Sequence, residues 1–297
     1  MINWHEALSQ WGEIQHNAPL AKRTTMGVGG AARCLFAPYD IAGLAQAMLH
    51  IPADMPLLPL GRGSNLLVAD EGFEGLVLDV GRLQTYDHDV MTMRAGAGMR
   101  MSKLAQKAAQ AGLTGIEFMA TVPGDIGGGV AMNAGAFGQQ VSDCLQQVQL
   151  VLRTGQIQTL DAQSLQMCYR SSVLPAGSIV VKADFNLQAG EREAIYERMR
   201  MMRQKRRDTQ PLEQPNCGSV FKNPTGNYAA RLIEHVGLKG HRIGQAQISS
   251  RHANFIVNHG QACTKDVLAL IRLAQQRVAA VYAIDLETEV CMLGMQS

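Results

Sequence analysis

The stretch that decides the fold is residues 123–138, PGDIGGGVAMNAGAFG, which contains six glycines. Glycine adopts backbone angles that are closed to other residues and lets backbone N–H groups approach a ligand closely. Such a stretch is typical of a loop that grips a pyrophosphate with its main chain, and it indicates a nucleotide cofactor. A tight loop inside a sheet has the same composition, so the interpretation needs a second signal.

That second signal is residues 61–68, GRGSNLLV, which follow a short apolar run. The turn offers backbone and hydroxyl donors just before a predicted strand, and two such loops can embrace one ligand. Neither loop contains G-x-G-x-x-G at a strand-to-helix turn with an acidic residue downstream, and the chain has no G-x-x-x-x-G-K-[ST]. The sequence therefore predicts a phosphate-binding architecture other than a Rossmann fold or a P-loop.

The composition of the 297 residues is that of an ordinary globular protein, with a net charge of +2 and 46% hydrophobic residues. This balance gives no nucleic-acid footprint. The N-terminal residues lack the apolar core of a signal peptide, and no later run is long enough to span a bilayer. We expect a cytoplasmic protein that binds neither nucleic acid nor membrane.

Cysteine and histidine spacings predict no metal site. The six cysteines are far apart, with no C-x-x-C pair and no histidine in a zinc-ligand spacing, and they are expected to be reduced and mostly buried. His235 and His241 are the nearest approach to a ligand pair.

Apolar periodicity predicts a mixture of helices and short strands. Helices are expected over residues 39–50, 99–111, 191–207, 228–236 and 264–282. Strands are expected over residues 57–60, 66–69, 75–80, 178–187, 253–257 and 284–293, with a hairpin over 145–160. The prolines of DTQPLEQPN, residues 208–216, break regular structure and indicate a domain boundary. We expect three domains, at residues 1–72, 73–207 and 208–297.

Six motifs occur in a fixed order along the chain: GRGSNLLV, PGDIGGGVAMNAGAFG, YRSS (169–172), CGSVFKNP (217–224), HANFIVN (252–258) and LETEV (286–290). From about residue 24 to the C-terminus, the chain resembles the UDP-N-acetylenolpyruvoylglucosamine reductase family, and its shorter form in particular. The resemblance implies an α+β protein. It consists of a two-subdomain FAD-binding fold of the vanillyl-alcohol-oxidase/PCMH type, followed by a C-terminal α+β substrate-binding domain.

The resemblance also implies an activity, in which FAD and NADPH reduce the enolpyruvyl ether of a UDP-sugar to UDP-N-acetylmuramate, a peptidoglycan precursor, in a monomeric enzyme. The implied catalytic residues are Arg170 for the substrate carboxylate, Ser219 as proton donor and Glu289. The residues implied for FAD are Gly61, Gly63, Ser64, Asn65, Pro123, Gly124, Gly127, Gly128, Asn133 and Gly135. The residues implied for the substrate are Tyr169, Lys222 and Asn223.

Two acidic residues qualify this assignment. Asp125 departs from the serine or threonine expected after Pro-Gly, and a carboxylate beside a pyrophosphate repels it unless it is paired or turned away. Glu287 shares a predicted strand face with Glu289, so periodicity alone does not separate the two.

Residue types alone also fit simpler interpretations. The Ser219 hydroxyl is equally typical of a turn, and Lys222 is equally typical of a surface cation. Arg170 could form an ordinary ion pair in a loop. The basic run 198–207 could be a solvated face of a helix. Two other functions remain open at this point: a flavin oxidase with a different substrate, and a nucleotide-binding regulatory module without turnover.

Overall fold

The computed structural model describes residues 4–295, which fall into two compact units built from interleaved segments of the chain. Unit 1 contains residues up to 16, 34–61 and 75–204, and unit 2 contains residues 17–33, 62–74 and the chain from 205 onward. Each unit has its own cluster of buried apolar side chains. The division into three consecutive domains stays a prediction.

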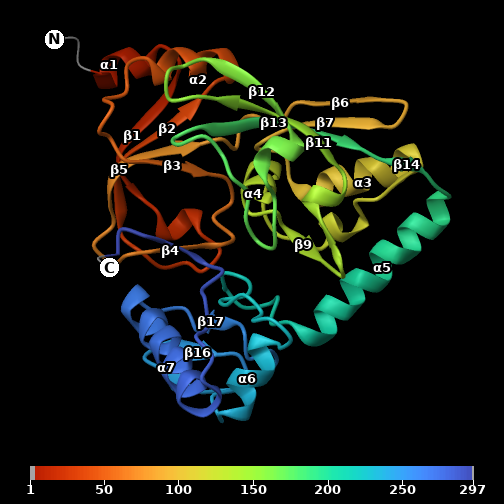
Figure 1. Cartoon of the computed structure of the whole chain (residues 1–297). Coiled ribbons are helices and arrows are strands. Elements are labelled where there is room, and N and C mark those ends of the chain that lie inside the picture. The colour runs from red at the N-terminus through yellow and green to blue at the C-terminus, as the bar shows by residue number, and fades with distance from the viewer. Residues whose placement is uncertain (1–3, 296–297) are drawn as a thin grey trace. The chain divides into compact units, whose positions relative to one another are not determined.

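Unit 1 contains a five-stranded antiparallel sheet of order β12-β11-β13-β7-β6 (Figure 1). Its strands are β6 (Tyr86–Asp89), β7 (Thr92–Gly96), β11 (Leu145–Val151), β12 (Ile157–Asp161) and β13 (Ile179–Asn186). A four-stranded sheet of order β1-β2-β5-β3 consists of β1 (Gly12–Pro19), β2 (Ala31–Pro38), β3 (Leu57–Leu60) and β5 (Phe73–Asp79). Two small ribbons pair β8 (Leu113–Thr114) with β14 (Gln188–Ala189), and β9 (Gly135–Ala136) with β10 (Gln139–Gln140).

Two helices of this part of the chain have caps that explain where they begin or end. In α2 (Ile41–Met48) the Asp40 carboxylate accepts the Gly43 N–H, a cap for the free donors of the first turn. The helix α3 (Met101–Ala111) ends at Gly112, whose φ of +71° gives a left-handed cap. The other helices are α1 (Trp4–Ser9), α4 (Ile126–Ala131) and α5 (Arg192–Thr209).

Unit 2 combines two helices with two small sheets. The antiparallel sheet β15-β16-β17 consists of β15 (Arg242–Ile243), β16 (Ala246–Ile248) and β17 (Ile256–Asn258). The helices α6 (Ala229–His235) and α7 (Thr264–Tyr282) pack beside it, as the blue end of Figure 1 shows. The strands β4 (Leu66–Val68) and β18 (Cys291–Leu293) form a parallel pair.

Most sequence predictions of secondary structure are confirmed to within a few residues. Apolar periodicity predicts Met101, Leu104, Ala105, Ala108 and Ala109 on the inward face of α3, and all five are buried. For α7 the same periodicity predicts Val267, Ile271, Ala274, Val278 and Val281 on the inward face, and the first four are buried. Val281, in contrast, is 62% exposed, so its predicted inward position is wrong.

The predicted strand over residues 284–293 is wrong for most of its length, because only Cys291–Leu293 forms a strand. The chain there has two successive partners: Thr288 bridges to Phe221, and residues from Cys291 onward pair with β4. A change of partner interrupts a continuous ladder, and a period of two in the sequence does not reveal it.

Two composition-based expectations also need correction. Cys168, Cys263 and Cys291 are exposed, so only half of the thiols are buried. In the basic run of α5, Arg198 is ion-paired with the buried Glu117 at 2.6 Å, and burial lowers the pKa of Arg206 to about 10. The run is therefore not a uniformly solvated face. No helix among residues 4–295 is both long and apolar enough to cross a bilayer.

Candidate functional site

The three successive glycines of the glycine-rich segment serve two different purposes. A Cβ placed on Gly127 would lie 2.9 Å from the Ala97 Cβ, and one on Gly129 would lie 2.8 Å from the Met101 sulfur. Gly127 and Gly129 are therefore required for packing of α4. Gly128 is exposed, and a Cβ placed on it would meet nothing within 4 Å. Of the three, only Gly128 leaves open space for a ligand to approach the backbone.

Close backbone approach explains two further glycines of this segment. Gly124 follows the exposed Pro123 and has a φ of +120°, a conformation that side chains strongly disfavour. Gly135 pairs with Gln140 in the β9–β10 ribbon, and a Cβ there would lie 2.5 Å from the Gln139 carbonyl oxygen. Both positions tolerate little besides glycine.

The unexpected Asp125 is buried, at 6% exposure, immediately before α4. Its side chain makes no capping bond to that helix. A Cβ added to Gly61 would lie 2.7 Å from the Asp125 Oδ2. Within unit 1, the glycine at position 61 therefore makes room for this carboxylate, and the two loops that the sequence singled out meet at this point.

Asn133 is fully buried and connects the glycine-rich segment to Cys168, the residue that precedes the YRSS motif. Its Nδ2 donates to the Cys168 carbonyl oxygen at 2.8 Å, and its Oδ1 accepts the Ser142 N–H at 2.9 Å. Both ends of the amide are thus used inside the protein. The structure gives this residue a bracing role, and its predicted contact with FAD stays a prediction.

Tyr169 and Arg170 occupy the tip of a tight turn. Cys168 and Ser171 exchange both backbone hydrogen bonds, at 3.0 and 3.1 Å, so the two residues between them project from the turn. Arg170 has a φ of +57°, which is uncommon outside glycine, and its Nη2 donates to the Gly135 carbonyl oxygen at 2.9 Å. Its guanidinium carbon lies 5.0 Å from the centre of the Tyr169 ring. The glycine-rich segment therefore helps to orient the predicted catalytic arginine.

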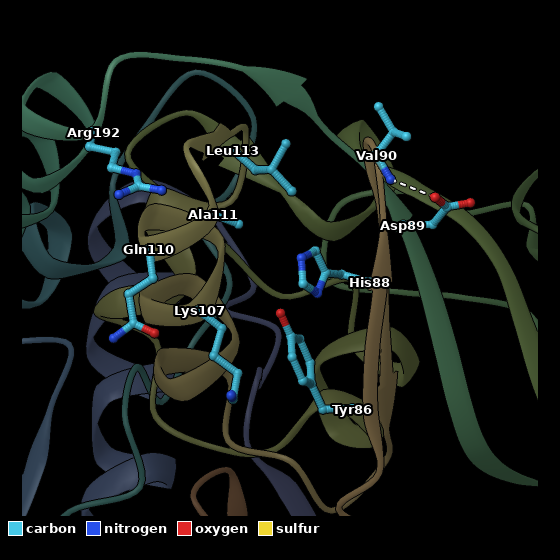
Figure 2. Close-up of a pocket in the computed structure, with 9 residues that line it drawn as sticks. All are labelled: Tyr86, His88, Asp89, Val90, Lys107, Gln110, Ala111, Leu113 and Arg192. Carbon is cyan, nitrogen blue, oxygen red and sulfur yellow. Dashed lines mark hydrogen bonds between the residues drawn. The ribbon is translucent and has the colours of Figure 1, made fainter.

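A hollow of about 660 Å³ in unit 1 contains none of the predicted site residues. Figure 2 shows β6 on one side of it and the end of α3 on the other. The Lys107 ammonium lies 4.3 Å from the centre of the Tyr86 ring, and burial, with Asp87, raises the pKa of that phenol. The sequence had no signal for this hollow, because its residues come from segments that carry no motif.

In unit 2, the GSN turn lies against two other parts of the chain. Gly63 has a φ of +58°, and a Cβ on it would lie 2.4 Å from the Arg23 carbonyl oxygen. The Asn65 Nδ2 donates to the Glu289 carbonyl oxygen at 3.0 Å, and the Asn65 carbonyl oxygen accepts the Cys291 N–H. Ser64 is half-buried in the same turn. The turn thus holds the backbone of the LETEV motif.

Ser219 lies beside the backbone of Glu289. The Glu289 N–H donates to the carbonyl oxygen of Val220 at 2.8 Å, and Phe221 bridges to Thr288. Ser219 and Glu289 are both half-buried. Unit 2 therefore brings two predicted catalytic residues from distant parts of the sequence into neighbouring backbone segments.

The two candidate glutamates have different surroundings. The Glu287 Oε1 lies 2.5 Å from the Lys222 Nζ in an ion pair, and the Glu287 side chain is 72% exposed. Glu289 lies on the segment that hydrogen-bonds to Val220. Asn223, predicted to touch substrate, also accepts the Ala229 N–H at 3.0 Å, which satisfies a free donor at the start of α6.

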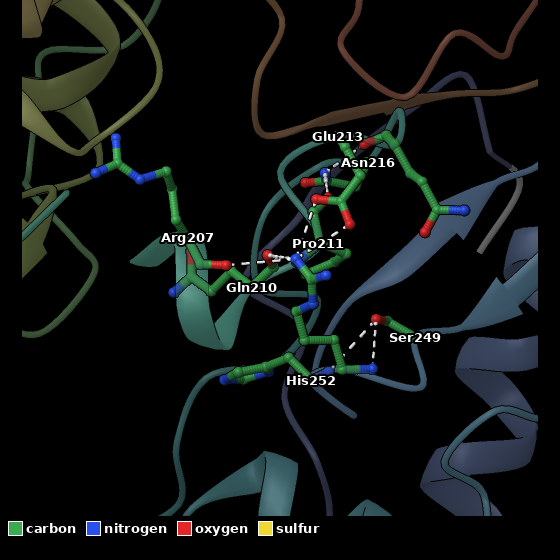
Figure 3. A network of polar contacts seen from close by, with 9 residues as sticks. Arg207, Gln210, Pro211, Glu213, Asn216, Ser249 and His252 are labelled. Carbon is green, nitrogen blue, oxygen red and sulfur yellow. Dashed lines mark hydrogen bonds and ion pairs between the residues drawn. The ribbon is translucent and has the colours of Figure 1, made fainter. Parts of the chain in front are cut away.

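A polar network braces the loop that precedes Ser219 (Figure 3). Arg251 Nη1 donates to the carbonyl oxygens of Arg207 and Gln210 and to the Glu213 carboxylate. Asn216 accepts the Gly218 N–H through its Oδ1, and its Nδ2 donates to the carbonyl oxygens of Pro211 and Gln214. For this segment the sequence predicted a break in regular structure and a domain boundary; it did not predict the hydrogen bonds that hold the loop.

Buried titratable groups near this loop favour their neutral forms. Burial raises the pKa of the Cys217 thiol to about 12, so it remains protonated two residues before Ser219. Burial, followed by the charge of Lys239, lowers the pKa of His252. Neither group is poised as a thiolate nucleophile or a permanent cation.

The geometry of unit 1 fits a flavin nucleotide. Exposed Gly128 leaves its backbone open, and the positive φ of Gly124 shapes the loop just before it. Main-chain groups in such a loop can hold a pyrophosphate without a lysine. Gly61, Gly124, Gly127, Gly128 and Gly135 of the predicted set lie in unit 1, whereas Gly63, Ser64 and Asn65 lie in unit 2.

Comparisons with known proteins agree with these features. The family model described as FAD binding domain matches residues 32–161, and the model of the UDP-N-acetylenolpyruvoylglucosamine reductase C-terminal domain matches residues 210–293. The UDP-N-acetylenolpyruvoylglucosamine reductase of Magnetococcus marinus is 45% identical over 286 residues, covering 94% of this chain and 92% of that protein. Reductase 1 of Bacillus cereus is 41% identical and covers 95% of each chain.

A solved structure gives the same result. The crystal structure of UDP-N-acetylenolpyruvylglucosamine reductase from Thermus caldophilus superimposes with a TM-score of 0.82 and 38% identity, covering 95% of this chain and 98% of that one. The predicted α+β fold, with an FAD-binding fold of the vanillyl-alcohol-oxidase/PCMH type and a C-terminal substrate-binding domain, is confirmed.

Proposed function

Because the chain belongs to the UDP-N-acetylenolpyruvoylglucosamine reductase family, we propose a residue-level account of how it reduces its substrate. The chain is an FAD-binding oxidoreductase of peptidoglycan precursor synthesis that acts on a UDP-sugar. The proposal adds that NADPH is the electron source, that the enolpyruvyl ether becomes the lactyl ether of UDP-N-acetylmuramate, and that the enzyme is a cytoplasmic monomer.

When bound, FAD would provide the redox chemistry of the reaction, because no amino-acid side chain can supply a hydride. Gly128 and the turn at Gly124 would hold the pyrophosphate through backbone groups, since open space remains over Gly128. Gly61, Gly63, Ser64, Asn65, Pro123, Gly127, Asn133 and Gly135 complete the proposed cofactor set. Several of these act by shaping the loops, as the packing of Gly127 and the internal hydrogen bonds of Asn133 indicate.

Ser219 donates the proton to the carbon next to the substrate carboxylate. A serine hydroxyl is a weak acid, but the carbon that receives the proton is strongly basic after hydride addition. The observation that carries this role is the backbone hydrogen bond between Val220 and Glu289, which holds Ser219 and a carboxyl-bearing segment side by side. Glu289 then hydrogen-bonds the developing enolic acid, and Lys222 or another cation stabilises the serine alkoxide.

Arg170 binds the substrate carboxylate with its guanidinium group as negative charge develops there. Its uncommon backbone conformation and its bond to Gly135 fix its direction before substrate arrives, which lowers the reorganisation needed during reaction. Tyr169, Lys222 and Asn223 contact the sugar nucleotide.

The test separates the two half-reactions by rapid mixing while the flavin absorbance is followed. In Ser219→Ala, NADPH should reduce the flavin at the wild-type rate, because this step needs no proton donor to substrate carbon. Reoxidation by the enolpyruvyl UDP-sugar should slow by about 100- to 10,000-fold, the usual contribution of a general acid.

Ser250→Ala is the matched control, since Ser250 is an exposed serine of the same unit. It should leave both half-reactions unchanged. Equal slowing of both steps in Ser219→Ala would remove Ser219 from the acid role. A wild-type protein that binds no FAD would defeat the whole account.

A further inference from the structure

Two histidines and a cysteine meet in unit 1 at a place that the sequence did not indicate. His5 lies on α1, His16 on β1 and Cys34 on β2, three elements that Figure 1 shows together at one end of this unit. One ligand atom from each residue lies within 4.8 Å of the others. The Cys34 sulfur is 4.0 Å from the His5 Nδ1, and the two imidazole centres are 4.7 Å apart.

These separations are close to those of a metal site. Zinc binds nitrogen at about 2.0–2.1 Å and sulfur at about 2.3 Å, so tetrahedral ligand atoms lie roughly 3.3–3.8 Å from one another. The pair of Cys34 and His5 nearly satisfies this already. His16 is exposed, so its ring can rotate to close the remaining gap without disturbing the core.

The three side chains differ in how firmly the surrounding structure holds them in place. Cys34 is 1% exposed and lies in a strand, so its position is fixed by packing. The His5 ring lies against Trp4, with ring centres 3.6 Å apart, which restricts its orientation. A rigid sulfur, an oriented imidazole and an adjustable imidazole together form a preorganised but accessible set.

We propose that His5, His16 and Cys34 bind one Zn²⁺, with a water molecule as the fourth ligand. Nitrogen and sulfur donors favour zinc over magnesium or calcium, which prefer oxygen. On binding, the S–H bond of Cys34 breaks, a zinc–sulfur bond forms and the proton passes to the solvent. No atom changes its oxidation state. The ion joins α1 to two strands of unit 1, and none of its ligands belongs to the residues proposed for flavin or substrate.

The test uses the full-length, FAD-loaded protein after chelator treatment. Calorimetric titration with Zn²⁺ should give one ion per chain, with about one proton released in buffers where the free thiol is protonated. X-ray absorption at the zinc edge should show one sulfur at about 2.3 Å, with nitrogen or oxygen at about 2.0–2.1 Å. The midpoint of thermal unfolding should rise by a few degrees under saturating zinc, because only the folded state assembles the site.

The decisive variant is His16→Ala, because an exposed side chain can be removed without unfolding the protein. It should weaken zinc binding by at least about 100-fold, since even changes outside the first ligand shell cost about 10- to 100-fold. Cys34→Ser should remove the sulfur signal where it folds. His50→Ala and Cys263→Ser are matched controls at an exposed histidine and an exposed cysteine, and they should bind zinc as the wild type does.

Three results would overturn the proposal: no stoichiometric zinc binding, unchanged affinity in His16→Ala, or a bound zinc surrounded only by nitrogen and oxygen. Selective binding of Cu⁺ but not Zn²⁺ by the same residues would overturn the identity of the metal.

Discussion

The glycine-rich segment of unit 1 and the Ser219 segment of unit 2 acquire their conformations by different means. In the first segment, Gly124, Gly127 and Gly128 act through the absence of a side chain. This absence can be seen directly in the sequence. In the second, Ser219 gains its surroundings from Glu289, which lies far along the chain and is held there by backbone pairing. Local steric requirements can thus be recognised in a motif, whereas the neighbours of a proposed proton donor are set only in the folded chain.

The largest expected effect tests the Ser219 segment. Glu289→Gln keeps the shape of the side chain but removes its acid, so flavin reoxidation by the UDP-sugar should slow by about 100- to 10,000-fold. Glu287→Gln should change this rate by less than about tenfold, because Glu287 forms an exposed pair with Lys222, a kind of contact that contributes little energy. Rapid-mixing measurements on both variants give the comparison, and the reverse ranking would transfer the catalytic role to Glu287.

An intermediate effect separates two neighbouring glycines. Gly127→Ala should destabilise the protein by about 1–3 kcal/mol, because the new methyl group would lie 2.9 Å from the Ala97 Cβ. Gly128→Ala should leave stability unchanged or raise it by up to about 1 kcal/mol, since its site is open and helical.

We expect the two variants to rank in the opposite way for FAD affinity, with the larger loss in Gly128→Ala. Gly128→Ala should weaken FAD binding by at least about tenfold, or ~1.4 kcal/mol, because the methyl group would occupy the space through which we propose that the cofactor approaches. Thermal unfolding of the flavin-free protein and fluorescence titration with FAD measure the two properties. Equal effects of both variants on both properties would contradict the division of roles.

The smallest expected effect concerns a contact of unit 1 that exists only in the folded protein. Burial raises the pKa of Glu117, but hydrogen bonds from Thr114, Arg198 and the Gly115 N–H outweigh it, so the pKa is lowered overall. A lowered pKa means that this stabilisation is present above about 4.5, the ordinary value, and is lost as the pH falls through the folded-state value.

Denaturant titrations between neutral pH and pH 3 measure this contribution. The wild type should lose more stability than Glu117→Gln as the pH falls below 4.5, because glutamine does not titrate. Parallel stability curves for the two proteins would show that Glu117 does not contribute to acid unfolding.

The sequence allowed most of the fold to be predicted where the signal was local. The helix at residues 101–111 was predicted, over 99–111, because apolar residues recur on one face and Gly112 can adopt the left-handed cap. The strand over 284–293 was predicted incorrectly. Alternation of apolar and polar residues does not show that the chain first bridges to Phe221, through Thr288, and then pairs with β4 from Cys291 onward.

The features of the candidate site also fall into two groups, those that the sequence could indicate and those that it could not. The glycine-rich segment and Arg170 could be selected as candidates from their motifs, because these motifs contain the residue types that the proposed roles need. The bracing role of Asn133, the Arg251 network and the meeting of His5, His16 and Cys34 could not, because their partners lie in segments without a common pattern.

By itself, the sequence determined the family, the glycine loops proposed to bind flavin and the residue types proposed for proton transfer. Tertiary structure alone decided which glycine of the GGG run remains open and which glutamate is paired with Lys222. It also brought two histidines and a cysteine within reach of one ion. The physical reason is that side-chain deletion and backbone conformation are properties of single residues. Distances between charges, donors and ligands are instead properties of the packed chain.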